Sequence, residues 1–343
     1  MSEPPRPSTF GEILDRAAHI YRSRFLVFLG IAALPAGVAL VFAAGIALLV
    51  AGAGAAGPRL GYPALTDAVA VMVLVLLVLV ALPIFLAAVA LGTAAMSHAA
   101  AHSFEAEAIS IRGCFAEAWK RGWRYIWLYL LQALIAWIAP FAVFFALLIL
   151  SAALIALAKR AGAGAPDDAL FGVAAILVVV ALVAYGLWML LRLSLAFPAC
   201  VVERMGATTA LKRSVSLSKG TRGRIFLMYL LVAALNSLLS MAITLPLTIL
   251  VALLIGANKP ESSQTLSTVL MIVLYGGGFA VRTLTRPVYG IALTLFYYDQ
   301  RIRLEGYDIE RMMQRAGLVA PPPPVGETAP ANQPSQAAHE ESQ

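Results

Sequence analysis

The chain has 343 residues, of which 61% are hydrophobic and only 13% are charged. Soluble domains average about 45–50% apolar and about 25% charged residues, so this composition excludes a soluble globular enzyme and predicts an integral membrane protein. Two cysteines and four histidines exclude a disulfide framework and a Cys/His metal cluster. The formal net charge of +7 is typical of a membrane protein whose cytoplasmic loops are rich in Lys and Arg and face anionic lipid. We therefore expect no nucleic-acid partner.

Six apolar stretches are long enough to cross a hydrocarbon core about 30 Å thick, which takes roughly 20 helical residues. They predict an all-α polytopic membrane protein with six transmembrane helices, because continuous apolar runs lack the alternation of a β-barrel strand. Prolines inside these stretches are tolerated as kinks in membrane helices. The expected spans are Phe25–Ala51, Ala68–Ala95, Ile126–Ala158, Ala169–Leu191 with an extension to Phe197, Ile225–Ala257 and Leu266–Tyr298.

The distribution of basic residues predicts the orientation of these spans. Of the 25 Lys and Arg residues, 19 lie in the segments on one side and four on the other, while Arg282 and Arg286 fall inside the sixth span. Cytoplasmic loops carry the excess of positive charge, so both termini are expected in the cytoplasm and the protein in the cytoplasmic membrane. The first apolar stretch exceeds the 7–15 residues of a signal-peptide core, so we expect no cleaved signal peptide.

Three short amphipathic stretches precede the odd-numbered spans, at residues 10–21, 111–121 and 208–218. Thr9 and Glu12 open the first with the spacing of a capping box. We interpret each stretch as a helix on the inner leaflet, so the fold is predicted to repeat one surface helix and a two-span hairpin three times. The 100-residue spacing of Arg24, Arg124 and Arg224 supports the repeat, although coincidence also accounts for it. On the second stretch, one face is expected to hold Ile111, Cys114, Phe115, Ala118 and Trp119.

The two ends of the chain have a different composition from the middle. Residues 1–8 contain three prolines, and residues 316–343 form a Pro-rich polar segment. Both are expected to be disordered, the second as a cytoplasmic tail. Residues 9–315 then form one transmembrane domain.

Several polar motifs around the spans resemble those of one known family. They are Phe10–Arg16, Phe197–Glu203, Ala210–Ser214, Leu217–Gly220 and Tyr297–Asp308.

Together these segments resemble the six-span membrane domain of the prokaryotic glycerophosphoryl diester phosphodiesterase membrane-domain family, over roughly residues 8–315. The resemblance implies a polytopic helical fold. The catalytic (β/α)₈ barrel of that family opens with a His-Arg pair, and no histidine of this chain is followed by arginine. We therefore expect a stand-alone member without the barrel, with no catalytic residues and no cofactor.

Arg282 and Arg286 form the main candidate site. They are four residues apart, on one helical face, inside a 33-residue apolar stretch. Intramembrane charges are by default functional hypotheses. A polar stripe on the fifth span begins with Asn236 and Ser240 and is expected to face them, which predicts a site for an anion or a lipid headgroup. In the alternative, both arginines extend from a tilted helix to the membrane surface.

Other polar residues have simpler interpretations. His98 and His102 have the i, i+4 spacing of zinc ligands, but Glu105 is the only near candidate for a third ligand, so we expect no metal. Glu203 is expected to pair with a nearby arginine. The basic loop 204–224 is expected to contact anionic lipid.

These observations favour a non-enzymatic membrane protein that organises lipid or partner proteins. Anionic lipid of the inner leaflet is the expected partner, and the sequence identifies no protein partner. The alternative is a small transporter or lipid translocator with its anion site at Arg282 and Arg286. An enzyme is the third possibility, for which the spans supply no constellation of His, Asp and Glu.

Overall fold

The computed structural model describes residues 8–60, 63–104, 109–160, 168–256, 263–307, 309 and 312–313. Every secondary-structure element within these residues is helical, which confirms the predicted all-α fold. In chain order the elements are α1 (Phe10–Ser23), α2 (Phe25–Leu60), α3 (Pro63–Phe104), α4 (Ile111–Lys120), α5 (Gly122–Ala133), the π-helix η1 (Leu134–Ile138), α6 (Ala139–Arg160), α7 (Asp168–Leu193), α8 (Ala196–Val202), α9 (Ala207–Leu217), α10 (Arg222–Gly256) and α11 (Ser263–Glu305).

Five segments of the described residues are long and apolar enough to cross a membrane, as expected for a multi-pass membrane protein. They overlap the first five predicted spans. The sixth predicted span lies in α11, whose side chains are described from Leu274 onward, and it is not among the five. The five segments are Phe25–Leu49, Ala68–Phe104, Gly122–Ala153, Ile176–Val202 and Arg222–Leu250.

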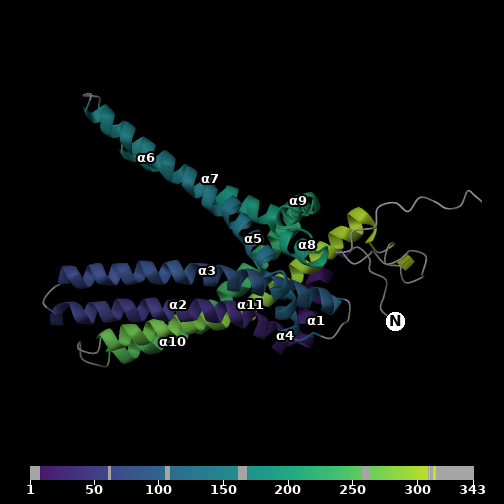
Figure 1. Cartoon of the computed structure of the whole chain (residues 1–343), viewed down its shortest axis with the longest axis horizontal. Coiled ribbons are helices and arrows are strands. Elements are labelled where there is room, and N and C mark those ends of the chain that lie inside the picture. The colour runs from purple at the N-terminus through teal and green to yellow at the C-terminus, as the bar shows by residue number, and fades with distance from the viewer. Residues whose placement is uncertain are drawn as a thin grey trace, which may run out of the picture.

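The long helices form two arms that separate from a common junction (Figure 1). We call α2, α3, α10 and α11 the long bundle, and α6 and α7 the hairpin arm. The junction consists of α1, α4, α5, α8, α9 and the adjoining ends of the long helices. Small residues allow close packing in the long bundle: a Cβ atom on Gly92 would lie only 3.0 Å from Cγ of Pro35. The hairpin arm extends away from the bundle on its own.

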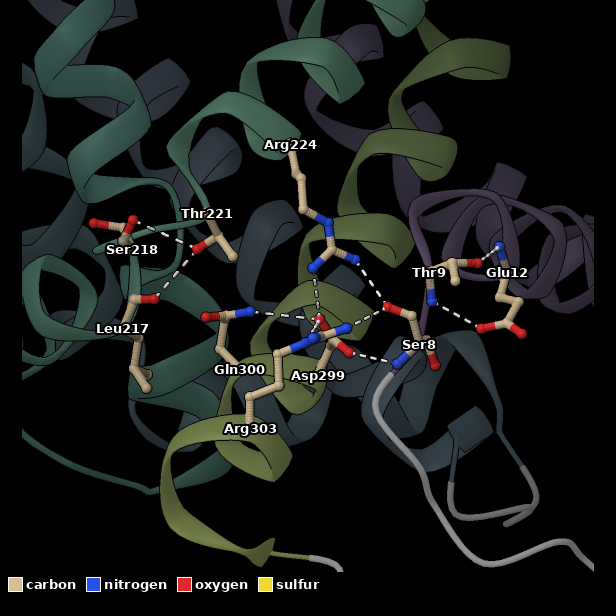
Figure 2. Close-up of polar contacts among 10 residues, drawn as sticks. All are labelled: Ser8, Thr9, Glu12, Leu217, Ser218, Thr221, Arg224, Asp299, Gln300 and Arg303. Carbon is tan, nitrogen blue, oxygen red and sulfur yellow. Dashed lines mark hydrogen bonds and ion pairs between the residues drawn. The ribbon is translucent and has the colours of Figure 1, made fainter.

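The three predicted amphipathic helices are confirmed as α1, α4 and α9. The capping box at the start of α1 is also confirmed, because the Glu12 amide donates to Thr9 Oγ1 and the Thr9 amide donates to Glu12 Oε2 (Figure 2). On α4, Cys114 and Ala118 are buried as expected, but Trp119 is 74% exposed. The expected apolar face of α4 was therefore too wide, because the neighbouring elements cover only the stripe around Cys114 and Ala118.

The core of the protein lies in the junction. Its largest fully buried side chains include Tyr125, Tyr297, Phe28 and Phe296. The rings of Phe104 and Tyr298 stack with centroids 4.6 Å apart, which joins the end of α3 to α11. Ser8 is buried here as well, so the expectation of disorder for residues 1–8 is wrong at that position. Residues 1–7 and the predicted tail 316–343 lie outside the described residues.

Two predicted spans are interrupted where they enter the junction. The third contains the π-helix η1 between α5 and α6, and the fourth breaks at Ser194 between α7 and α8. The break is stabilised by side chains of other elements: Gln132 Nε2 donates to the Leu193 carbonyl at 2.7 Å, and Ser214 Oγ accepts the Leu195 amide at 3.1 Å. Such irregular backbone is tolerated at membrane depth when protein groups satisfy it.

By contrast, α11 runs on through the Gly276–Gly278 segment and through Pro287. The proline has no N–H, so it cannot donate to the Thr283 carbonyl one turn earlier. The helix has 43 residues and is therefore about 64 Å long, more than a membrane requires. Its last turns lie within the junction.

Candidate functional site

A cavity of about 440 Å³ lies where the hairpin arm separates from the long bundle, and we call it the cleft cavity. It is enclosed by α3, α5, η1, the α7–α8 break, α10 and α11. Its walls are mainly apolar and aromatic, with Tyr129, Gln132 and Ser194 among the few polar groups. Arg286 is the only charged residue among the described residues that line it.

Arg286 is held against the α3 wall of the cleft cavity by a neutral partner. Its Nη2 donates to Thr93 Oγ1 at 3.1 Å, and the Thr93 hydroxyl in turn donates to the Val89 carbonyl at 2.7 Å. The ion pairs found among the described residues do not include Arg286. A half-buried guanidinium with only a hydroxyl partner retains donors and positive charge for an anion.

The other residues of the predicted site are not brought into this cavity. Arg282, one turn before Arg286 on the same face of α11, is exposed beyond the cavity. Asn236 Oδ1 accepts the Thr285 hydroxyl at 3.1 Å, and the Ser240 carbonyl accepts the Thr244 hydroxyl at 2.7 Å. The polar stripe of α10 therefore faces Thr285 of α11. Thr285 is on the face of α11 next to the one that carries the two arginines, and α10 packs on that neighbouring face.

Arg286 lies near the junction end of the long bundle. Gly37 of α2 is level with Phe279 of α11, since a Cβ on Gly37 would lie 4.0 Å from the Phe279 ring. The two helices are antiparallel, so Phe25 is level with Ile291. Arg286 is five residues, or about 8 Å, from the level at which α2 begins.

Thr93, Tyr129 and Gln132 were not predicted as site residues. A hydroxyl or amide inside an apolar span can be noticed in a sequence, because such groups need partners in hydrocarbon. These three residues line one cavity with Arg286 because three helices pack together, and no local sequence pattern predicts that packing.

Two groups of ion pairs hold the junction together. In the first, buried Asp299 accepts hydrogen bonds from the Ser8 amide at 2.7 Å, Arg303 Nε at 3.0 Å and Arg224 Nη1 at 3.2 Å (Figure 2). Arg224 and Arg303 both donate to the Ser8 carbonyl as well. The segment before α1, the start of α10 and the end of α11 are thereby joined at one carboxylate.

The second group contains Glu203, Arg213, Arg301 and Glu305. Arg213 donates to Glu203 at 3.0 Å and to Glu305 at 2.7 Å, which confirms the expectation that Glu203 pairs with an arginine. Burial would raise the pKa of the Glu305 carboxyl, but hydrogen bonds from Arg213 and Arg301 outweigh it, so this pKa is lowered. Glu203 is therefore occupied in an ion-pair network.

His98 and His102 lie on the same face of α3, with stacked rings whose centroids are 6.3 Å apart. His98 Nε2 is 3.3 Å from the Tyr125 hydroxyl. Within the described residues, no group of three or more His, Cys, Asp or Glu side chains could hold a metal ion. Glu105, the third ligand considered for a metal, lies outside the described residues.

Comparison with models of protein families gives a match. A family model described as a domain of unknown function (DUF7847) matches residues 120–300, slightly more than half of the chain. The chain belongs to this family. No curated protein and no solved structure matches the chain.

The DUF7847 match runs from the end of α4 to Gln300 in α11. It includes Gln132, Arg286 and Asp299, but not Thr93 of α3. Most walls of the cleft cavity therefore lie within the residues that the family model matches, while its α3 wall lies outside them. Chemically, the cavity offers a single cation, hydroxyl and amide donors, and apolar walls, which is the composition of a binding site for an amphiphilic anion.

Proposed function

We propose that this DUF7847 member is a non-enzymatic membrane protein that binds an anionic phospholipid in the cleft cavity. The observation that carries the proposal is Arg286, the one charge among the described lining residues, with a hydroxyl instead of a carboxylate as its partner. A lipid phosphate supplies the missing negative charge, and arginine binds phosphate through charge-assisted hydrogen bonds. The proposal develops the interpretation of a protein that organises lipid.

The proposed placement has six spans, with α11 as the sixth, and both termini in the cytoplasm. The positive-inside distribution of Lys and Arg supports this orientation and the cytoplasmic membrane. The junction then faces the inner leaflet. Exposed Trp119 and Trp123 on α4 and α5 support the same placement, since tryptophan is enriched at membrane–water interfaces.

The shape of the two arms explains why a lipid, and not a small anion alone, is the proposed ligand. The cleft cavity is at the closed end of the space between the long bundle and the hairpin arm. A headgroup near Arg286 has room in the cavity, and its acyl chains continue between the arms. Apolar lining residues such as Phe85, Trp137 and Leu190 suit these chains.

We also propose that three units of one short helix and one helix pair build the fold, as in the resemblance to the membrane domain of glycerophosphoryl diester phosphodiesterases. The order α1–α2–α3, α4–α5/α6–α7 and α9–α10–α11 supports this arrangement. In that scheme α1, α4 and α9 are the inner-leaflet helices of the three units.

Native mass spectrometry of the detergent-purified protein tests lipid binding. Wild type is expected to retain an anionic phospholipid such as phosphatidylglycerol. Replacing Arg286 by glutamine removes the charge but keeps a donor, and is expected to weaken retention about tenfold or more, since hydrogen bonds to charged groups contribute about 1.5–3 kcal/mol.

The Arg282→Gln variant is the matched control, because Arg282 is on the same helical face but outside the cavity. Equal lipid retention in wild type and Arg286→Gln would contradict the proposal. Added phosphatidylcholine, which has no net charge, should not replace the anionic lipid.

A lipid translocator is the second candidate, favoured by the exposure of Arg282 one turn beyond the cavity. The two arginines then provide successive positions for a phosphate along α11. In proteoliposomes, this function requires transbilayer movement of a fluorescent anionic lipid that both Arg282→Gln and Arg286→Gln reduce. Retention of lipid without such movement supports binding alone.

A further inference from the structure

A second cavity, of about 350 Å³, lies on the far side of α3 from the cleft cavity. It is formed by the end of α3, the junction of α4 and α5, the turn between α8 and α9, and Tyr298 of α11. We call it the basic pocket, because its described lining residues include Lys120, Arg121 and Arg204 but only one carboxylate, Glu117. None of its lining residues lines the cleft cavity.

The charges of the basic pocket do not cancel. Glu117 forms an ion pair with Lys120 at 3.0 Å, and this hydrogen bond lowers the pKa of the Glu117 carboxyl. With that pair balanced, Arg121 and Arg204 leave the described wall with two positive charges. No ion pair of the described residues includes either arginine.

Arg204 has a backbone conformation that supports a binding role. Its φ angle is +53°, in the left-handed region that arginine rarely adopts, and it is the only described non-glycine residue with positive φ. Arg124 holds this turn by donating to the Arg204 carbonyl at 2.7 Å and to the Met205 carbonyl at 3.4 Å. Backbone strain of this kind is concentrated at functional sites, where surrounding contacts enforce it.

The inner wall adds groups that can donate hydrogen bonds. The Tyr125 side chain is buried, and its hydroxyl is 3.3 Å from His98 Nε2. His102 stacks on His98 one turn further along α3. The two guanidiniums, beside an already paired carboxylate, suit a tetrahedral oxyanion with several acceptor oxygens, and the Tyr125–His98 pair can add one donor.

We propose that the basic pocket binds a phosphate group on the cytoplasmic face of the junction, with Arg121 and Arg204 as its principal ligands. The phosphate belongs either to a soluble phosphate compound or to a lipid headgroup that reaches the junction. This site is separate from Arg286, so the proposal stands or falls independently of lipid binding in the cleft cavity.

Thermal unfolding of the full-length protein in detergent, with added inorganic phosphate, tests the proposal. Chloride at the same ionic strength is the reference, because screening alone affects exposed charges. Phosphate is expected to raise the Tm of wild type in a saturable manner, since a ligand that binds only the folded state stabilises it. A parallel titration with dihexanoyl phosphatidic acid distinguishes the two sources: a response to inorganic phosphate indicates a soluble ligand, and a response to the lipid alone indicates a headgroup in this pocket when Arg121→Gln or Arg204→Asn weakens it.

Two variants remove the proposed ligands with little disturbance of the fold. Arg204→Asn deletes the guanidinium while asparagine tolerates the left-handed conformation, and Arg121→Gln deletes the other. Each is expected to raise the apparent Kd for phosphate at least tenfold. Arg112→Gln, an exposed arginine of α4 outside the pocket, is the control and should respond like wild type.

The same titrations can overturn the proposal. It fails if neither phosphate compound shifts the Tm of wild type beyond the chloride reference. It also fails if Arg204→Asn and Arg121→Gln, shown by circular dichroism to be folded, respond like wild type. Arg204→Lys, which keeps the charge, should recover part of the response.

Discussion

The long bundle and the hairpin arm differ in how many helices pack together: α2, α3, α10 and α11 in the bundle, and α6 with α7 in the arm. In the bundle, glycines bring helices together, as at Gly92 against Pro35 and Gly277 against Ile243. In the hairpin arm, Ile149 of α6 is 66% exposed and Val180 of α7 is 59% exposed. Its close contacts are at its base, where Gly186 packs on Trp137. The bundle is therefore held by contacts among four helices, although it also leaves apolar side chains exposed, such as Leu79 of α3 at 70%.

The largest expected effect concerns the ion pairs at the junction end of the bundle. Asp299→Ala leaves Arg224 and Arg303 without their shared carboxylate, and removing one partner of a buried charge pair costs about 3–5 kcal/mol. Thermal unfolding in detergent should show a large fall in Tm. Asp15→Ala, at an exposed position of α1, is the control and should change stability by less than about 0.5 kcal/mol. Similar Tm values for the two variants would mean that the bundle does not depend on this cluster.

An intermediate effect is expected from a methyl group inserted between α2 and α3. Gly92→Ala places a Cβ 3.0 Å from Cγ of the rigid Pro35 ring, and overpacking of this kind costs about 1–3 kcal/mol. Gly276→Ala is the matched control in α11, because no atom lies within 4 Å of its Cβ position. This control should be neutral or gain up to about 1 kcal/mol from helix propensity. Chemical denaturation in mild detergent measures both, and equal effects would contradict the role of Gly92 in close packing.

The smallest effect is expected in the hairpin arm. Ile149→Ala and Val180→Ala remove side chains that extend away from the protein, so the free energy of unfolding in detergent should change by no more than about 0.5 kcal/mol. The oligomeric state, measured by light scattering, should also stay the same. A clear loss of stability or a change of oligomer would show that a second protein surface covers this arm.

The sequence predicted the elements whose signals are local. Capping-box spacing located the start of α1, and hydrophobic periodicity located α4 and α9. Apolar length located the five segments that can cross a membrane. These predictions succeeded because each depends on residues a few positions apart. The apolar face expected for α4 was too wide at Trp119, since periodicity identifies a helical face but not how much of it the neighbouring elements cover.

The candidate site was only partly accessible from the sequence. Arg286 was identified because a charge in an apolar stretch is conspicuous, and it does line a cavity. Its expected neighbours Asn236 and Ser240 are elsewhere, since the rotation of α10 about its own axis is set by packing with α11. Gln132 and the α7–α8 break were missed for the same reason: the break is stabilised by a side chain 61 residues away. The basic pocket likewise joins residues of four separate segments.

The proline in α11 has a mechanical consequence. Beyond Pro287 the helix is held by the ion pairs at Asp299 and Glu305, whereas before it the same helix packs on α10, with Gly277 against Ile243. The Thr283 carbonyl has no backbone donor at this point, so bending costs least here. α11 is in effect two helical segments that meet at Pro287, and Arg286 is the residue immediately before this proline. A ligand bound at Arg286 would connect this position to Thr93 and fix the angle between the two segments of α11.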